Sequence, residues 1–167
     1  MNVGQFVANI ASLLTGSPMR AVIQRVDRAC VKINHQELSS INEGVLVLLG
    51  VEKEDTEVDA DYILEKTINL RIFEDEQDKM NRSLLDINGA MMVVSQFTLL
   101  GDCIKGRRPS FVAAEKPVRA NYLYEYFIKE AKEKVKSLAT GKFQEMMEIE
   151  LVNNGPVTIL LDSRKNF

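Results

Sequence analysis

The sequence is poor in the residues from which metal sites and catalytic triads are usually built. It has one histidine, His35, and two cysteines, Cys30 and Cys103, which are far apart and form no CxxC or Cys/His grouping. A zinc site of ordinary ligand spacing cannot be assembled from these residues, so we expect no metal and no cofactor. A Ser-His-Asp triad is nearly excluded, because His35 falls in a predicted turn and no second histidine can replace it.

Long apolar runs and excess positive charge are also missing. No run approaches the roughly 18 apolar residues of a membrane-spanning helix, and free cysteines suit a reducing compartment, so we expect a cytoplasmic protein without a membrane partner. The formal net charge of −3 argues against a generally basic surface for nucleic acid. Any contact with phosphates must therefore be local.

The first eighteen residues contain no charged side chain and end in Gly16-Ser17-Pro18, just before Met19. Apolar residues at helical spacing predict a short amphipathic helix there, ended by Gly16 and Pro18. We interpret residues 1–18 as an N-terminal appendage, vector-derived or incidental, and residues 19–167 as the domain itself.

Strand patterns dominate the domain. Residues 20–26 and 29–33 are rich in β-branched side chains, Asn34-His35 marks a turn, and residues 36–41 return as a second strand. The apolar run 45–51 is typical of a central strand that is covered on both faces.

Asn88-Gly89 is the strongest hairpin signal and precedes an apolar strand predicted over residues 90–100. Two further strands are expected at residues 145–152 and 157–162.

Two helices complete the expected fold. Thr56 and Asp59 form a carboxylate variant of the capping box, and apolar residues share one face of the helix that follows. A second apolar stripe predicts a helix over residues 119–138, ended by Gly141. The order of elements indicates a single α+β domain, with an antiparallel or mixed, barrel-like β-sheet core and two main helices.

An acidic run around the first helix start could suggest a metal site, but its ligand spacing is wrong for a binding loop. We interpret it as a solvated helix start, where carboxylates favour the positive end of the helix dipole. The run consists of Glu52, Glu54, Asp55, Glu57, Asp59 and Asp61.

Three other segments are unusual. Ser95-Gln96-Phe97-Thr98 places polar side chains in the most apolar predicted strand, where they are costly unless they are paired or used. Lys105, Arg107 and Arg108 form a local basic loop, either a phosphate-binding loop or an ordinary soluble surface. Between the last two strands, residues 153–158 contain Gly155-Pro156, which predicts a tight hairpin or a cis peptide bond.

These segments, together with the strand sequences at 19–26, 46–53 and 69–73, resemble the D-aminoacyl-tRNA deacylase family. The resemblance runs from Met19 to about Asp162. It implies a cytosolic homodimer that hydrolyses the ester between a D-amino acid, or mischarged glycine, and the terminal adenosine of tRNA.

The resemblance also implies roles for individual residues. Catalysis and the pocket for adenosine and ester would fall to Ser95, Gln96, Phe97 and Thr98. Gly155 and Pro156, supported by Arg25 and Asn153, would select for chirality by reaching into the partner subunit's pocket as a Gly-cisPro element. The basic residues Lys105, Arg107 and Arg108 would contact the tRNA.

The chemistry is consistent with the scarcity of catalytic residues. An aminoacyl ester is already activated, and a neighbouring ribose hydroxyl can assist attack by water, so orientation and backbone donors suffice. Thr98 as a covalent nucleophile is the competing hypothesis, but no base is apparent beside it. A non-catalytic RNA-binding module and a hydrolase of small D-amino-acid esters remain the alternative functions.

Overall fold

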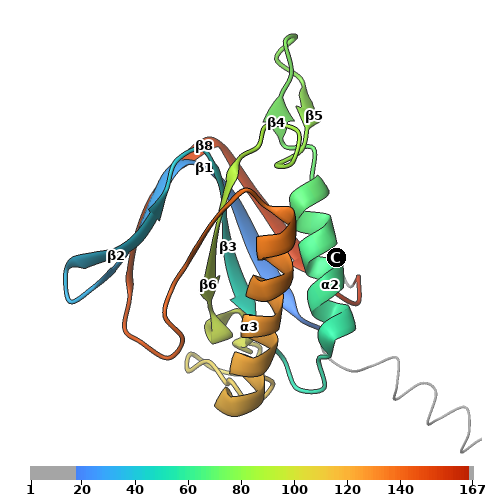
Figure 1. The fold of residues 1–167 in the computed structure, drawn as a ribbon. Coiled ribbons are helices and arrows are strands. Elements are labelled where there is room, and N and C mark those ends of the chain that lie inside the picture. Colours follow the sequence, from blue (N-terminus) through green and yellow to red (C-terminus); the bar gives the residue numbers. More distant parts are fainter. Residues whose placement is uncertain (1–17, 166–167) are drawn as a thin grey trace, which may run out of the picture.

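The computed structural model describes residues 18–165, and its sheet is organised around one long strand, β1 (Arg20–Ile33) (Figure 1). On one edge, β1 pairs antiparallel with β3 (Gly44–Gly50) through its first half and with β2 (Gln36–Ile41) through its second half. On the other edge, β8 (Glu148–Asp162) pairs antiparallel with β1 along nearly its full length. The predicted strands on either side of the Asn34-His35 turn are confirmed.

The sheet continues with parallel strands. β6 (Ala90–Ser95) lies parallel to β3, and β7 (Ser137–Thr140) lies parallel to β6. The two ends of the path β2-β1-β3-β6-β7 approach each other, because the hydroxyl of Ser39 donates to the carbonyl of Thr140 at 2.8 Å. The mixed, nearly closed and barrel-like sheet confirms the predicted α+β fold class.

A short ribbon of β4 (Phe73–Glu74) and β5 (Met80–Arg82) stands apart from the sheet at the top of Figure 1. Two helices, α2 (Glu57–Asn69) and α3 (Pro117–Lys134), pack beside each other against the sheet. No helix within residues 18–165 is long and apolar enough to cross a membrane.

The start of α2 confirms the predicted cap. Thr56 is the N-cap residue. Oδ2 of Asp59 accepts hydrogen bonds from the main-chain N–H of Thr56 at 2.8 Å and from the hydroxyl of Thr56 at 2.9 Å. The predicted inward face is buried. Its members are Ala60, Ile63, Leu64, Thr67 and Ile68.

Both faces of β3 are covered, as predicted for a central strand. Val45, Val47 and Leu49 belong to the core under the two helices. Leu46 belongs to a second apolar cluster on the opposite face, which Met147 and two residues of β8, Ile149 and Leu151, help to cover.

The predicted helix 119–138 extends too far. α3 ends at Lys134, Val135 has extended backbone angles, and Leu138 pairs with Met91 in the parallel ladder of β7 and β6. The apolar stripe continues past the helix end because Leu138 is also needed in the core, now from a strand.

The hairpin predicted at Asn88-Gly89 is wrong, although the turn is real. Asn88 has a φ of 51°, and Gly89 donates its N–H to the carbonyl of Leu84 at 3.0 Å. Ala90 then pairs in parallel with Gly44, from a strand far earlier in the chain. A local turn signal fixes the turn but not the strand that pairs after it.

The C-terminal region also differs from prediction, because β8 is one strand rather than two strands joined by a hairpin. Gln24 pairs with Thr158 and Val26 pairs with Asn153, so residues 154–157 of β8 face the single residue Arg25. Gly155-Pro156 therefore lies in a wide bulge. The N-terminal helix predicted within residues 1–18 lies outside the described residues, apart from Pro18.

Candidate active site

An open cavity of about 620 Å³ lies at the C-terminal ends of the parallel strands β3 and β6. Three of the four predicted catalytic residues, Ser95, Gln96 and Phe97, line it. Its lining includes two carboxylates, Glu115 and Glu145, and no lysine or arginine. The cavity suits an uncharged or cationic group better than a phosphate.

The segment after Ser95 leaves the sheet, which corrects the strand predicted over residues 90–100. Gln96 donates its N–H to the carbonyl of Leu49 at 2.7 Å, and a short 3₁₀ helix, η1 (Phe97–Leu100), follows. The N–H of Leu99 donates to the carbonyl of Gln96 at 3.2 Å. The polar residues of this apolar segment therefore lie where the strand ends, facing the cavity or solvent.

Thr98 is exposed at η1 and does not line the cavity. Its hydroxyl accepts a hydrogen bond from Nε2 of Gln96. His35 cannot serve it as a base, because His35 lies in the exposed turn between β1 and β2 and its Nδ1 contacts Oε1 of Glu148 at 2.9 Å. Within the described residues, the structure gives Thr98 a hydrogen-bond donor and no general base.

Gly155-Pro156 is a cis peptide bond at the exposed tip of the β8 bulge. Gly155 has a φ of +110°, a conformation that other residues rarely adopt. A β-carbon at this position would stand 2.6 Å from Nη2 of Arg25. Glycine is therefore required both by its backbone angle and by the arginine beneath it.

Arg25 holds the base of the bulge. It is only 6% exposed, and Nε donates to the carbonyl of Asn154 at 3.3 Å while Nη1 donates to the carbonyl of Ile72 at 2.5 Å. Nη2 lies 3.8 Å from Oε1 of Glu74. One buried guanidinium thus connects β8 to the start of the β4-β5 ribbon.

The two asparagines before Gly155 tie the same bulge to β1. With its amide nitrogen facing carbonyl oxygens, Asn153 donates to Arg25 at 2.8 Å and to Val157 at 3.1 Å. The side chain of Asn154 donates to a carboxylate oxygen of Asp27. These contacts fix the main chain on both sides of Gly155-Pro156.

The bulge and the cavity of one chain are not brought together. Leu49, at the cavity, pairs with Ala21, whereas the bulge faces Arg25, four residues and roughly 13 Å further along β1. The bulge belongs to β8 on one edge of β1, whereas the β3 and β6 part of the cavity lies beyond the other edge. Neither Gly155 nor Pro156 lines the cavity.

The predicted basic residues lie together on an exposed loop next to η1. Asp102 and Ser110 close the loop by exchanging main-chain hydrogen bonds of 2.8 Å and 2.9 Å. Lys105, Arg107 and Arg108 are exposed between them. Figure 1 shows this region in yellow below the sheet, at the start of α3.

The acidic run is a solvated helix start only in part. Glu54, Glu57 and Asp61 are exposed as predicted, but Glu52 and Asp55 are 2% and 0% exposed. This part of the prediction is wrong because the chain after β3 turns inward to meet the segment before α3.

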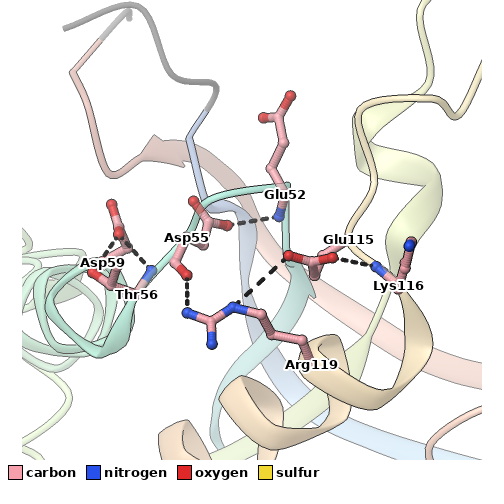
Figure 2. A network of polar contacts seen from close by, with 7 residues as sticks. All are labelled: Glu52, Asp55, Thr56, Asp59, Glu115, Lys116 and Arg119. Atoms are coloured by element: carbon pink, nitrogen blue, oxygen red, sulfur yellow. Dashed lines mark hydrogen bonds and ion pairs between the residues drawn. The ribbon is translucent and has the colours of Figure 1, made fainter. Parts of the chain in front are cut away.

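Figure 2 shows how Asp55 is held. Its Oδ2 accepts the main-chain N–H of Glu52 at 2.6 Å, and its main-chain carbonyl accepts Nη2 of Arg119 at 2.9 Å. Nε of Arg119 lies 3.8 Å from Glu115, whose carboxylate also accepts the N–H of Lys116 at 2.6 Å. Burial raises the pKa of Asp55 to about 8. The network joins the start of α2 to the wall of the cavity.

No group of three or more His, Cys, Asp or Glu side chains within residues 18–165 is arranged to hold a metal ion.

Much of the cavity wall comes from residues that the sequence did not single out. They belong to α3, to the segment that joins β7 to β8, and to the start of β8. The members are Pro117, Ala120, Tyr124, Phe143, Gln144, Glu145, Met146, Met147 and Ile149.

Comparison with known proteins identifies the family. The family model for D-Tyr-tRNA(Tyr) deacylase matches residues 22–162. The D-aminoacyl-tRNA deacylase of Syntrophus aciditrophicus (strain SB) is 62% identical over 149 residues, which cover 89% of this chain and 100% of the relative. The D-aminoacyl-tRNA deacylase of Clostridioides difficile (strain 630) is 57% identical with the same coverage.

Two solved structures share the fold of this chain. A protein described as c-Myc DNA Unwinding Element Binding Protein is 37% identical, with a TM-score of 0.81 over 85% of this chain and 97% of that chain. A probable eukaryotic D-amino acid tRNA deacylase shares the fold, with a TM-score of 0.73 and 17% identity over 87% of this chain and 99% of that chain. The extent of the family match and the identity to these relatives show that the chain belongs to the D-Tyr-tRNA(Tyr) deacylase family.

Proposed function

We propose that this protein hydrolyses the ester bond of D-aminoacyl-tRNA, and of glycine mischarged on tRNA, releasing free amino acid and tRNA. The observation that carries this proposal is the cavity lined by Ser95, Gln96 and Phe97, in a chain 62% identical to a D-aminoacyl-tRNA deacylase. The cytoplasm is the proposed location, and neither a cofactor nor a metal is required.

The substrate supplies part of the chemistry. A ribose hydroxyl next to the ester assists attack by water, and the protein orients the ester and stabilises the oxyanion. Ser95, Gln96 and Phe97 line the cavity and hold the terminal adenosine and the ester, and Thr98 supports them by accepting a hydrogen bond from the side chain of Gln96. The N–H groups of Phe97 and Thr98, at the start of η1, contribute donors, whereas the N–H of Leu99 is already bonded to the carbonyl of Gln96.

Selection against L-amino acids rests on the main chain at Gly155 and Pro156. A main chain held by Arg25 and Asn153 cannot move aside as a side-chain rotamer can. An L side chain would collide with the carbonyl oxygens of this element, while hydrogen or a D side chain fits. Rejection by a built-in clash is an effective source of specificity.

A homodimer completes the site, with the Gly155-Pro156 bulge of one subunit entering the cavity of its partner. The separation of bulge and cavity along β1 supports this arrangement. An apolar row also crosses the sheet, from buried Val94 through half-buried Leu48 and Val22 to exposed Leu160. Within residues 18–165 no strand pairs with the outer edge of β8, and together with this edge the row offers a surface for a second copy.

Lys105, Arg107 and Arg108 contact the tRNA backbone. None of them makes an ion pair or hydrogen bond with another residue in the range 18–165, so their charges are available to phosphates. Lys105 and its neighbours would position the acceptor end without reading its sequence.

A three-substrate assay tests the proposal. The protein is incubated with D-Tyr-tRNA, L-Tyr-tRNA and D-tyrosine methyl ester, and release of free tyrosine is followed. The proposal predicts turnover of D-Tyr-tRNA alone. Turnover of the methyl ester would instead indicate a small-ester hydrolase, and binding without turnover would indicate an RNA-binding module.

A further inference from the structure

Phe97 and Phe111 form an exposed aromatic pair between the cavity and the basic loop. Their ring centroids are 5.1 Å apart and the rings meet edge to face at 70°. Phe97 is 57% exposed and Phe111 is 37% exposed. Two aromatic rings that pack on each other for stability alone would hide more of their surface.

The position of Phe111 is built into the loop. A β-carbon at Gly101 would stand 3.0 Å from Cε1 of Phe111 and 3.1 Å from the carbonyl of Thr98, so glycine lets the ring lie against η1. After Phe111, the chain is fixed to the end of β3, because Glu115 donates its N–H to the carbonyl of Val51 at 3.0 Å. The ring therefore has a defined place beside Phe97.

Charge divides this region into an inner and an outer part. The cavity lining carries carboxylates and no cation, whereas the loop beyond the aromatic pair carries Lys105, Arg107 and Arg108. Two apolar residues, Ile104 on this loop and Val112 just after it, are exposed as well. A polyanion with flat apolar faces is complementary to such a surface, with its phosphates kept outside the cavity.

We propose that the Phe97-Phe111 pair is a stacking surface for an unpaired base that precedes the terminal adenosine of the tRNA, with the loop cations on the adjoining phosphates. This inference rests on the proposed function, since the cavity is taken to hold the terminal adenosine and the ester. Phe97 is shared between the cavity and the stacking surface, while Phe111 serves the upstream base alone. Stacking of this kind tolerates any base.

The test is Phe111→Leu, which keeps an apolar side chain and removes the aromatic face. Two substrates are compared: D-Tyr-tRNA, and 3′-O-(D-tyrosyl)adenosine, which has the ester and the terminal nucleoside but no upstream nucleotide. We expect KM for D-Tyr-tRNA to rise about tenfold with kcat unchanged. Turnover of the adenosine ester should be unaffected.

Tyr122→Leu is the matched control. Tyr122 is an exposed aromatic residue of α3 whose hydroxyl bonds to Glu57, outside both the cavity and the loop. The control should behave as wild type with both substrates. Phe111→Trp, which keeps an aromatic face for stacking, should have the wild-type KM for D-Tyr-tRNA.

A binding measurement separates this inference from the proposed function. Fluorescence anisotropy is measured with two labelled uncharged RNA hairpins, one ending in an unpaired ACCA and one lacking those four nucleotides. Phe111→Leu should weaken binding of the first hairpin about tenfold and leave the second unchanged, even if the wild type deacylated nothing. Equal affinity of variant and wild type for the ACCA hairpin, or an equal loss on the adenosine ester, would overturn the inference.

Discussion

Gly155 and Arg25 are fitted to each other: a β-carbon on Gly155 would stand 2.6 Å from Nη2 of Arg25, and Nε of that arginine donates to the carbonyl just before the glycine. The guanidinium is buried and also bonded to Ile72, so it cannot move away freely. The conformation of the bulge is therefore coupled to the interior of the same chain. This coupling determines where the bulge main chain points.

Gly155→Ala should misplace the bulge. The added methyl group meets Arg25, and alanine is strained at a φ of +110°. We expect kcat/KM for D-Tyr-tRNA to fall on the order of 10²-fold, as geometric misplacement of this size can do. Steady-state deacylation of D-Tyr-tRNA by wild type and by Gly155→Ala measures this change in kcat/KM.

Gly106→Ala provides the stability control for that variant. Gly106 also has a positive φ, of +81°, but its added methyl group would have no atom within 4 Å. Urea unfolding of this variant and of Gly155→Ala therefore separates the loss of stability due to the positive φ alone from the loss due to the clash with Arg25. Wild-type activity in Gly155→Ala would contradict the role given to the bulge.

Arg25→Lys should destabilise the fold by about 2 kcal/mol. Lysine keeps the charge but cannot reach the carbonyls of both Asn154 and Ile72 in the geometry of a guanidinium. Urea unfolding should show a lower midpoint with an unchanged slope. Arg28→Lys, an exposed position on the same strand, is the control and should leave the midpoint in place.

Thr98→Ala should retain at least about a tenth of the deacylase activity. The hydroxyl accepts a bond from Gln96 and has no general base beside it among the described residues, so it is a poor nucleophile. Loss of a true nucleophile costs roughly 10⁴-fold or more in kcat. Single-turnover hydrolysis of D-Tyr-tRNA distinguishes the two outcomes, and a loss of that size would establish Thr98 as the nucleophile.

Asp55 should make stability depend on pH. Burial raises the pKa of Asp55 to about 8 in the folded protein, against about 3.9 in an unfolded chain. Between pH 4 and pH 8, the folded protein therefore keeps a proton on Asp55 that the unfolded chain has released. The free energy of unfolding therefore falls as pH rises from 5 to 8, by at most about 1.4 kcal/mol per pH unit from this group. Asp55→Asn should remove that part of the slope.

The measurement is urea unfolding of wild type and Asp55→Asn at pH 5, 6, 7, 8 and 9. The stability of wild type relative to the variant should decline up to pH 8 and then level off. Glu54→Gln, an exposed neighbour in the same turn, is the control. A difference that stays constant from pH 5 to 8 would show that Asp55 is ionised in the folded protein.

Local features of the fold could be predicted from the sequence because their physical causes are local. The Thr56 cap needs only Asp59 three residues later, and the central strand needs only its apolar run. Asn88 forms its turn as predicted, but which strand Ala90 joins depends on a distant segment. The same limit applies to Leu138, whose apolar side chain suits a helix or a strand equally.

The candidate site was predictable only in its separate pieces. The sequence could single out the segments around Ser95 and Gly155 as unusual, but not their offset of roughly 13 Å along β1, because that offset follows from strand pairing. Phe143 and Tyr124 carry no local signal for a cavity wall. They reach it through the packing of α3 and of the segment before β8.

The most direct test of the account is a mixed dimer. One subunit carries Gly155→Ala, the other carries Gln96→Ala with Phe97→Ala, and the heterodimer is isolated by two different tags. If the bulge of one subunit completes the cavity of the other, the heterodimer contains one intact site and should regain about half of wild-type activity, although each variant is impaired alone. A heterodimer no more active than its two parents would contradict a shared site.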